Sequence, residues 1–340
     1  MSGWPARRWR VVAAASAVAV LAGIVGWVAS PWGRSAAGPS EPVVLATGVP
    51  GGVSHRYGVA LAESAGHLNG VISTVVTEGS RENLDLLVRG EATFALATAD
   101  VVEAYLATEP GAESIRAVAR LYESYVHLVV AADGPVHRLA DLRGRRVAIG
   151  PPNSGTPLVA DRILAALGID PTTDVTWLEM GPREAIASLN ARRGDGAGGG
   201  PDSGIDAFIM VDGTPSPDLG RLTGGRLIDL ADAADALLGY RACPAAACAV
   251  YHGGTVPAGT YSGLAVAITT VAVPTLLLTT TRVGADVVGQ LTELVFDSAP
   301  GIAVNVPAVR QIDRHAAIFT GPVPLHDGAR AYYRGTKVAA

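Results

Sequence analysis

Short apolar runs alternate with amphipathic stretches along most of the chain. Runs of apolar and β-branched residues predict strands over 43–47, 71–77, 93–97, 115–121, 127–132, 146–149, 175–178 and 205–211. Between several of them, apolar residues recur every three to four positions and predict helices over 56–65, 82–89, 157–167 and 183–189. The pattern restarts near residue 146, so the sequence predicts two α/β lobes in tandem.

Two later stretches depart from this pattern. Residues 190–204 read NARRGDGAGGGPDSG and predict a mobile surface loop inside the second lobe, because so many glycines cannot pack a core. Residues 264–279 are apolar enough to suggest a second membrane span, whereas Pro274 and the Val and Thr content favour a pair of buried strands.

The first forty residues have the pattern of a membrane-targeting segment. Three arginines precede the uncharged run 11–28, and Ser, Pro and Gly follow it. At 1.5 Å per residue the run spans about 27 Å, close to the ~30 Å hydrocarbon core. The segment is therefore either a retained anchor helix or a signal peptide cleaved near 35–37. Both alternatives predict that the rest of the chain is extracytoplasmic.

Composition excludes several chemistries. The chain has 340 residues, enough for one large or two ordinary domains. Its only lysine is Lys337, which excludes lysine-based Schiff-base, phosphate-loop and kinase sites. The seven histidines and two cysteines show no metal-ligand spacing, so we expect no metal and no cofactor.

Export also changes the meaning of the charge. Four arginines and no acidic residue precede Glu41, so the exported part has 22 basic and 31 acidic residues, a net charge of −9. Such a surface repels nucleic acid and anionic lipid. In an oxidising compartment, Cys243 and Cys248 are expected either to form a disulfide or to remain as two buried thiols.

Two predicted strand-to-helix junctions share one design. Residues 47–54 (TGVPGGVS) and 150–157 (GPPNSGTP) each place glycines and hydroxyl side chains at a helix N-terminus, where N–H groups and the helix dipole favour an anion. If the two loops face each other across a cleft, they form an anion-binding clamp. The alternative is that Ser54 and Thr156 are ordinary N-caps of their own helices.

Other candidates carry two interpretations each. Asp100 follows a strand, where α/β sheets place ligand residues, but it is also a candidate N-cap of the next helix. Tyr122, Tyr125 and His127 either line a cleft or belong to the core. Asp100 or His127 acting as an acid or base would make the protein an enzyme, although no GxSxG or similar context supports this.

Seven segments in a fixed order resemble the TAXI family, the extracytoplasmic solute-binding subunits of one class of TRAP transporters. They are TGVPGGVSHRYG (47–58), EGSRENLDLLVRGEATFALATADV (78–101), RAVARLYESYVHLVV (116–130), LADLRGRRVAIGPPNSGT (139–156), IDAFIMVDGTPSP (205–217), VPAGTY (256–261) and VPLHDGARAYYR (323–334).

This resemblance implies a periplasmic-binding-protein fold of type II, with two α/β lobes joined by crossing strands. The implied parts are an anchor or signal segment (1–40), lobe 1 (41–130), lobe 2 (131–262), a return to lobe 1 (263–335) and a tail (336–340). It implies capture of a small carboxylate-bearing solute, either a glutamate-like amino acid or a dicarboxylate, and delivery to the membrane subunits of a TRAP permease. A membrane-tethered sensor remains an alternative.

The resemblance also implies a set of solute ligands. By matching position, these are Thr47, Gly52, Val53, Ser54, Thr98, Asp100, Tyr122, Ser154, Gly155 and Thr156. The family more often has Gln-Ser-Asp where this chain has Thr98-Ala99-Asp100, a shorter polar side chain at the first position.

Overall fold

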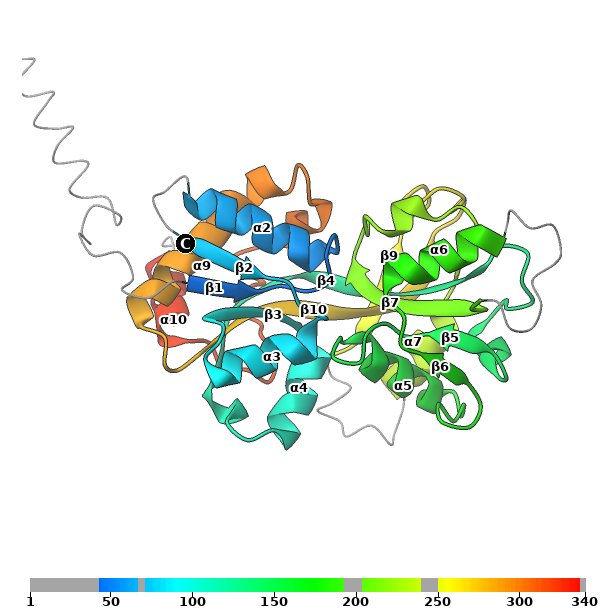
Figure 1. Cartoon of the computed structure of the whole chain (residues 1–340). Coiled ribbons are helices and arrows are strands. Elements are labelled where there is room, and N and C mark those ends of the chain that lie inside the picture. Colours follow the sequence, from blue (N-terminus) through cyan, green and yellow to red (C-terminus); the bar gives the residue numbers. More distant parts are fainter. Residues whose placement is uncertain (1–42, 67–70, 193–203, 240–249, 337–340) are drawn as a thin grey trace, which may run out of the picture.

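The computed structural model describes residues 43–66, 71–192, 204–239 and 250–336. Within them two α/β lobes are joined by two long strands, β4 (Ile115–Ala131) and β10 (Ile268–Thr280) (Figure 1). This is the two-lobed periplasmic-binding-protein architecture with crossing strands that the family resemblance implies. The targeting segment, most of the glycine-rich loop, and Cys243 and Cys248 lie outside the described residues.

Lobe 1 combines the beginning of the chain with its end. Its strands are β1 (Val43–Ala46), β2 (Ile72–Val75) and β3 (Phe94–Thr98). Its helices are α2 (Val53–Gly66), α3 (Ser80–Arg89), α4 (Ala99–Thr108), α9 (Ala285–Ile302) and α10 (Asp327–Gly335). In Figure 1, α2 and α9 lie on one side of the strands, and α3 and α4 lie on the other.

Lobe 2 is built from the middle of the chain. Its strands are β5 (Arg146–Ala148), β6 (Thr176–Leu178), β7 (Ala207–Gly213), β8 (Gly225–Ile228) and β9 (His252–Val256). Its helices are α5 (Thr156–Ala166), α6 (Pro182–Arg192) and α7 (Ala231–Gly239). The predicted helices in both lobes are confirmed, with ends displaced by at most three residues.

One sheet connects the lobes, in the order β2-β1-β3-β10-β4-β7-β5-β6. β10 pairs with β3 of lobe 1 through Thr275–Leu278 and with β9 of lobe 2 through Ile268–Ala272. β4 pairs with β10 up to Tyr125 and with β7 from Ser124 onward. The transition between lobes therefore lies near Ser124 and Thr275.

The prediction of separate strands over 115–121 and 127–132 was wrong. β4 is one strand of 17 residues, because the intervening residues also pair with β10. Ser124 Oγ, for example, lies 2.7 Å from Thr275 Oγ1, and both side chains are buried.

Residues 264–279 form neither a membrane span nor a pair of strands. They contribute most of the single strand β10, in which Pro274 lies opposite Glu123 and a register shift follows between Thr275 and Leu276. Because proline has no N–H to donate to a neighbouring strand, β10 continues through Pro274 only where its pairing with β4 is irregular. No helix among the described residues is both long and apolar enough to cross a membrane.

Candidate functional site

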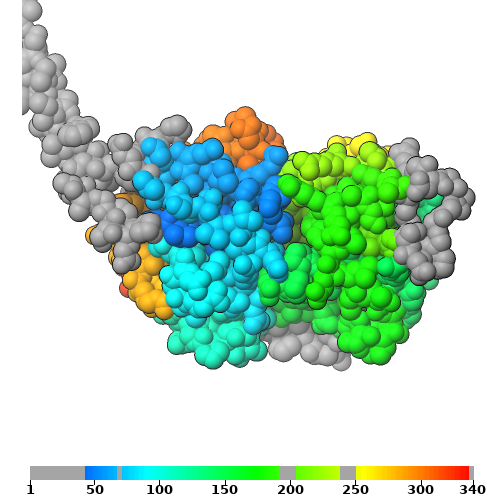
Figure 2. All heavy atoms as spheres, in the orientation of Figure 1, coloured from blue at the N-terminus to red at the C-terminus, as the bar shows by residue number. Residues whose placement is uncertain are grey.

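A cavity of about 90 Å³ lies between the two lobes. Lobe 1 contributes the ends of β1 and β3 and the start of α3, and lobe 2 contributes the loop after β5 and the end of β7. In the space-filling view the two lobes are in contact along a seam (Figure 2). The cavity is therefore large enough for water molecules or for one small solute.

The first predicted loop joins β1 to α2 and lines the cavity through Thr47, Gly48, Val49, Gly52, Ser54 and His55. Its backbone needs glycine at residue 51, where φ is +87°. Thr47 is fixed by its hydroxyl, which donates to the Val75 carbonyl at 2.9 Å. Ser54 Oγ lies 2.8 Å from the hydroxyl of Tyr122.

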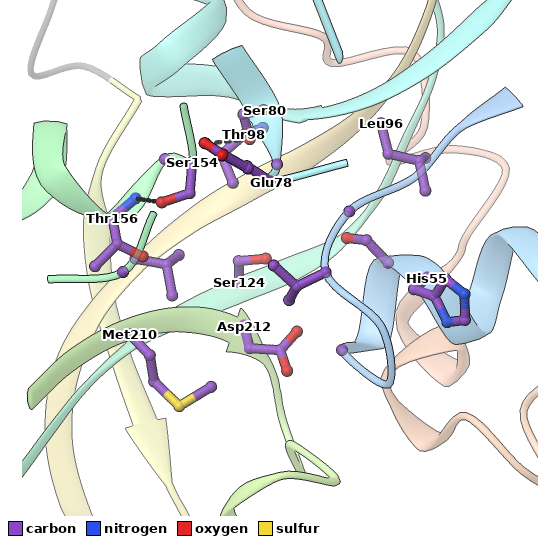
Figure 3. Close-up of a pocket in the computed structure, with 18 of the residues that line it drawn as sticks. His55, Glu78, Ser80, Leu96, Thr98, Ser124, Ser154, Thr156, Met210 and Asp212 are labelled. Carbon is purple, nitrogen blue, oxygen red and sulfur yellow. Dashed lines mark hydrogen bonds between the residues drawn. The ribbon is translucent and has the colours of Figure 1, made fainter. Parts of the chain in front are cut away.

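The second predicted loop joins β5 to α5 and lines the cavity through Gly150, Pro151, Ser154, Gly155 and Thr156. Gly150 has φ of +79°, which turns the chain sharply after the strand. The Ser154 hydroxyl donates to the Pro151 carbonyl at 2.7 Å and so closes the turn. Both predicted loops therefore border one cavity from opposite lobes (Figure 3).

Neither loop follows the simple N-cap interpretation. Ser54 lies inside α2 and its hydroxyl is paired with Tyr122. Thr156 is the first residue of α5, and the N-cap is Gly155, which has no side chain to cap with. The backbone N–H of Val53, at the start of α2, donates instead to Asp212 Oδ1 of lobe 2 at 3.1 Å.

A third glycine-hydroxyl turn, Glu78-Gly79-Ser80 at the start of α3, also lines the cavity. Ser80 Oγ accepts the Thr98 backbone N–H at 3.1 Å and ties this turn to the end of β3. Behind both, the buried Asn83 amide donates to the carbonyls of Thr47, at 3.0 Å, and Leu96, at 2.6 Å. The ends of β1 and β3 are thereby fixed at the cavity wall.

Asp212, at the end of β7, projects into the space between the lobes (Figure 3). Its carboxylate accepts the N–H groups of Val53 and Gly213, at 3.1 and 2.9 Å, and the hydroxyl of Ser216 at 2.8 Å. Burial raises the pKa of Asp212 to about 6, against the effect of these three hydrogen bonds, and the charge of Asp218 raises it further.

The lobes are closed on each other by direct hydrogen bonds. The Asn153 carbonyl of lobe 2 accepts the N–H groups of Arg81 and Glu82 at the start of α3, at 3.1 and 3.2 Å. The Asn153 N–H in turn donates to Glu78 Oε2 at 3.1 Å. Gly155 lies so close to lobe 1 that an added Cβ would be 3.1 Å from Thr98 Oγ1.

A second contact between the lobes lies beside α4. The buried Asp100 carboxylate accepts the Tyr251 hydroxyl at 2.8 Å. Arg162 of α5 donates to the same hydroxyl at 3.1 Å and to Glu103 of α4 at 3.2 Å. We call Asp100, Glu103, Arg162 and Tyr251 the lateral clasp.

The structure gathers most of the predicted ligand residues but not all of them. Residues that line the cavity are Thr47, Gly52, Ser54, Thr98, Ser154, Gly155 and Thr156. Three others do not: Val53 directs its N–H to Asp212, Tyr122 lies in the core behind Ser54, and Asp100 belongs to the lateral clasp.

Sequence reasoning missed several lining residues, notably Glu78, Ser80, Ser124, Asp212 and Thr275. Two signals for them were present. Glu78-Gly79-Ser80 repeats the glycine-hydroxyl design of the other two loops, and Asp212 ends a strand in the way that drew attention to Asp100. Nothing in the sequence distinguishes Ser124 or Thr275 from other polar residues of long strands.

The residues considered for acid-base catalysis lie away from the cavity lining. His127 is buried in β4, with Nε2 3.1 Å from the Tyr261 hydroxyl, and burial lowers its pKa to about 4. The Asp100 carboxylate is part of the lateral clasp, where it accepts the Tyr251 hydroxyl. The described residues also contain no group of three or more His, Cys, Asp or Glu able to hold a metal ion.

Comparison with known proteins gives a family and a set of distant structures. The profile of the NMT1-like family matches residues 45–336. The periplasmic aliphatic sulphonate binding protein SsuA from Escherichia coli is 16% identical, with a TM-score of 0.46 over 87% of this chain and 83% of that one. The alkanesulfonate-binding protein SsuA from Xanthomonas axonopodis pv. citri, bound to MOPS, is 17% identical, with a TM-score of 0.44 over 88% of this chain and 92% of that one. The ligand binding component of an ABC-type import system from Staphylococcus aureus is 12% identical, with a TM-score of 0.46 over 86% of this chain and 90% of that one.

Proposed function

The chain belongs to the NMT1-like family, and we propose that it is an extracytoplasmic solute-binding protein that closes two lobes on a small solute for import. The observation that carries this proposal is the cavity itself, which is lined by glycine-hydroxyl loops from both lobes. A solute that contacts both lobes stabilises the closed state over the open one. A solute that contacts only one lobe would have equal affinity for both states and would shift nothing.

The proposed solute is small and bears a carboxylate. The cavity volume of about 90 Å³ limits its size. The hydroxyl side chains of Ser80, at the start of α3, and Thr156, at the start of α5, line the wall. Hydroxyl donors beside a helix N-terminus are groups that bind carboxylates.

Delivery is proposed to a TRAP-type permease, as the resemblance to the TAXI family implies. The targeting segment predicted at 11–28 supports a location of the lobes outside the cytoplasmic membrane, either released or tethered. Uptake of the solute into vesicles that contain the permease should then require both this protein and an ion gradient. Uptake that proceeds equally without this protein would exclude the delivery role.

Solute binding can be tested without choosing a candidate solute. Protein purified without refolding is denatured, and the released small molecules are identified by mass spectrometry. We expect one small acid in a near-stoichiometric amount, which rebinds to solute-free protein in calorimetry and is recovered unchanged. Conversion of that compound during incubation would support an enzyme instead, and the absence of any rebinding compound would contradict the proposal.

A further inference from the structure

The charged side chains around the cavity are mostly acidic. Among the described lining residues, Glu78, Asp212 and Asp218 carry carboxylates, His55 carries an imidazole, and none is arginine or lysine. Asp218 has its counter-charge nearby, because Arg183 Nε lies 3.2 Å from its Oδ1. In the part of the chain that the structure describes, no basic side chain forms an ion pair with Glu78 or Asp212.

Asp212 is buried, with 9% of its surface exposed, and unlike the still more buried Asp218 it has no arginine beside it among the described residues. Its Oδ1 accepts two backbone N–H groups, whereas its Oδ2 accepts the Ser216 hydroxyl. A carboxylate oxygen accepts about two hydrogen bonds, so Oδ2 can accept one more donor from the cavity. Figure 3 shows the carboxylate directed into the space between the loops.

Neutral donors compensate this buried charge only in part. The raised pKa of Asp212, about 6, is the expected sign of a carboxylate that lacks a cation. A positively charged nitrogen beside Oδ2 would supply that charge at short range, where the low dielectric makes the attraction strong. A second carboxylate in the same position would be repelled for the same reason.

We propose that Asp212 is a specificity-determining residue that selects a solute carrying a positively charged nitrogen in addition to its carboxylate. This inference rests on the proposed solute-binding function and narrows it. The nitrogen binds beside Asp212, with Glu78 adding negative potential from lobe 1. The solute's carboxylate binds elsewhere in the cavity, because Asp212 itself occupies the N–H group at the start of α2.

The test uses the two charged fragments separately. Methylammonium and acetate are each titrated against solute-free protein at constant ionic strength, with thermal unfolding and protein-observed NMR as readouts. The variants are Asp212→Asn, which keeps the shape of the side chain, and Asp229→Asn as the matched control. Asp229 also accepts two backbone N–H groups, from Ala231 and Thr269, but does not line the cavity.

We expect methylammonium to bind the wild-type protein and Asp229→Asn alike, and Asp212→Asn at least tenfold more weakly. Acetate should bind Asp212→Asn more tightly than wild type. No methylammonium binding to folded wild-type protein, or equal binding by Asp212→Asn, would overturn the inference. If a solute that has no cationic nitrogen closes the lobes, the role of Asp212 is overturned but the proposed solute-binding function stands. Methylammonium binding at Asp212 in a protein that closes on no solute would instead overturn the function.

Discussion

Gly155 is a residue at which lobe closure can be changed without straining the local backbone. It lies in lobe 2, and an added Cβ would meet three lobe 1 atoms: Thr98 Oγ1 at 3.1 Å, Val101 Cγ2 at 3.3 Å and Ser80 Oγ at 3.4 Å. Its own backbone, with φ of −83°, accepts alanine without strain. The clash of Gly155→Ala therefore arises only when the lobes meet.

The expected magnitude follows from how firmly those neighbours are held. Thr98, Val101 and Ser80 are all buried, and the Thr98 N–H is bonded to Ser80 Oγ at 3.1 Å, so they cannot move away freely. Overpacking by one methyl group in such surroundings costs about 1–2 kcal/mol. Gly155→Ala should therefore weaken solute affinity by about 5- to 30-fold.

The assay combines calorimetry with the solute released from the purified protein and small-angle scattering to measure closure. The control is Gly284→Ala, because Gly284 also precedes a helix and its added Cβ would meet nothing within 4 Å. Both variants should unfold at nearly the same temperature without solute, and only Gly155→Ala should lose affinity. Wild-type affinity in a correctly folded Gly155→Ala protein would refute the closed arrangement of the lobes.

Three further changes test other parts of the structure. Tyr251→Phe removes the hydroxyl that donates to the buried Asp100, so it should shift the protein toward the open state by about 1–3 kcal/mol, measured by scattering. His127 has a pKa lowered to about 4, so the folded state resists its protonation. The contribution of neutral His127 to the free energy of unfolding is complete above pH 6.5. It falls by about 3 kcal/mol as the pH drops from 6.5 toward 4, which denaturant titration measures. Gly58→Ala should destabilise lobe 1 by roughly 1–3 kcal/mol in the same assay, because the new Cβ would be 2.4 Å from Thr47 Cγ2.

Each of these changes has its own control. Glu103→Gln removes the charge of a carboxylate in the lateral clasp that is 17% exposed, and it should have a smaller effect than Tyr251→Phe. An equal effect would contradict the role of the buried hydrogen bond between Tyr251 and Asp100. The raised pKa of Asp212 makes the folded state more stable as the pH falls, which opposes the effect of His127. The contribution of His127 is therefore measured as the unfolding free energy of the wild type minus that of His127→Gln. If this difference does not change between pH 6.5 and 4, the prediction for His127 is contradicted. Gly289→Ala in α9 meets only an ordinary contact at 3.6 Å, so its stability should stay the same or rise.

The sequence predicted those parts of the fold that depend on local pattern. Helices such as α3 and α5 have a clear amphipathic period and end at glycines, and they were placed within a few residues. The sequence predicts two strands in place of β4 because polar residues such as Glu123 and Ser124 interrupt the apolar pattern. They stay in the strand because β10, more than 140 residues away in sequence, supplies their partners.

The candidate site, like the fold, could be predicted from the sequence only where its residues are close together in the chain. The loops at 47–54 and 150–157 could be predicted because each carries its glycine-hydroxyl design within a few residues. Asp100 and Asp212 both follow strands, and the sequence alone gives no means of ranking them. Only the approach of Tyr251 assigns Asp100 to the lateral clasp, and only the meeting of the lobes brings Asp212 to Val53.

The central claim is that one solute touches both lobes in the cavity between them. A crystal structure of the protein purified with its endogenous solute tests this most directly. Density for a small molecule in contact with both the 47–54 loop and the 150–156 loop is the predicted result. A solute bound outside this cavity, or held by one lobe while the other stays apart, would contradict the account.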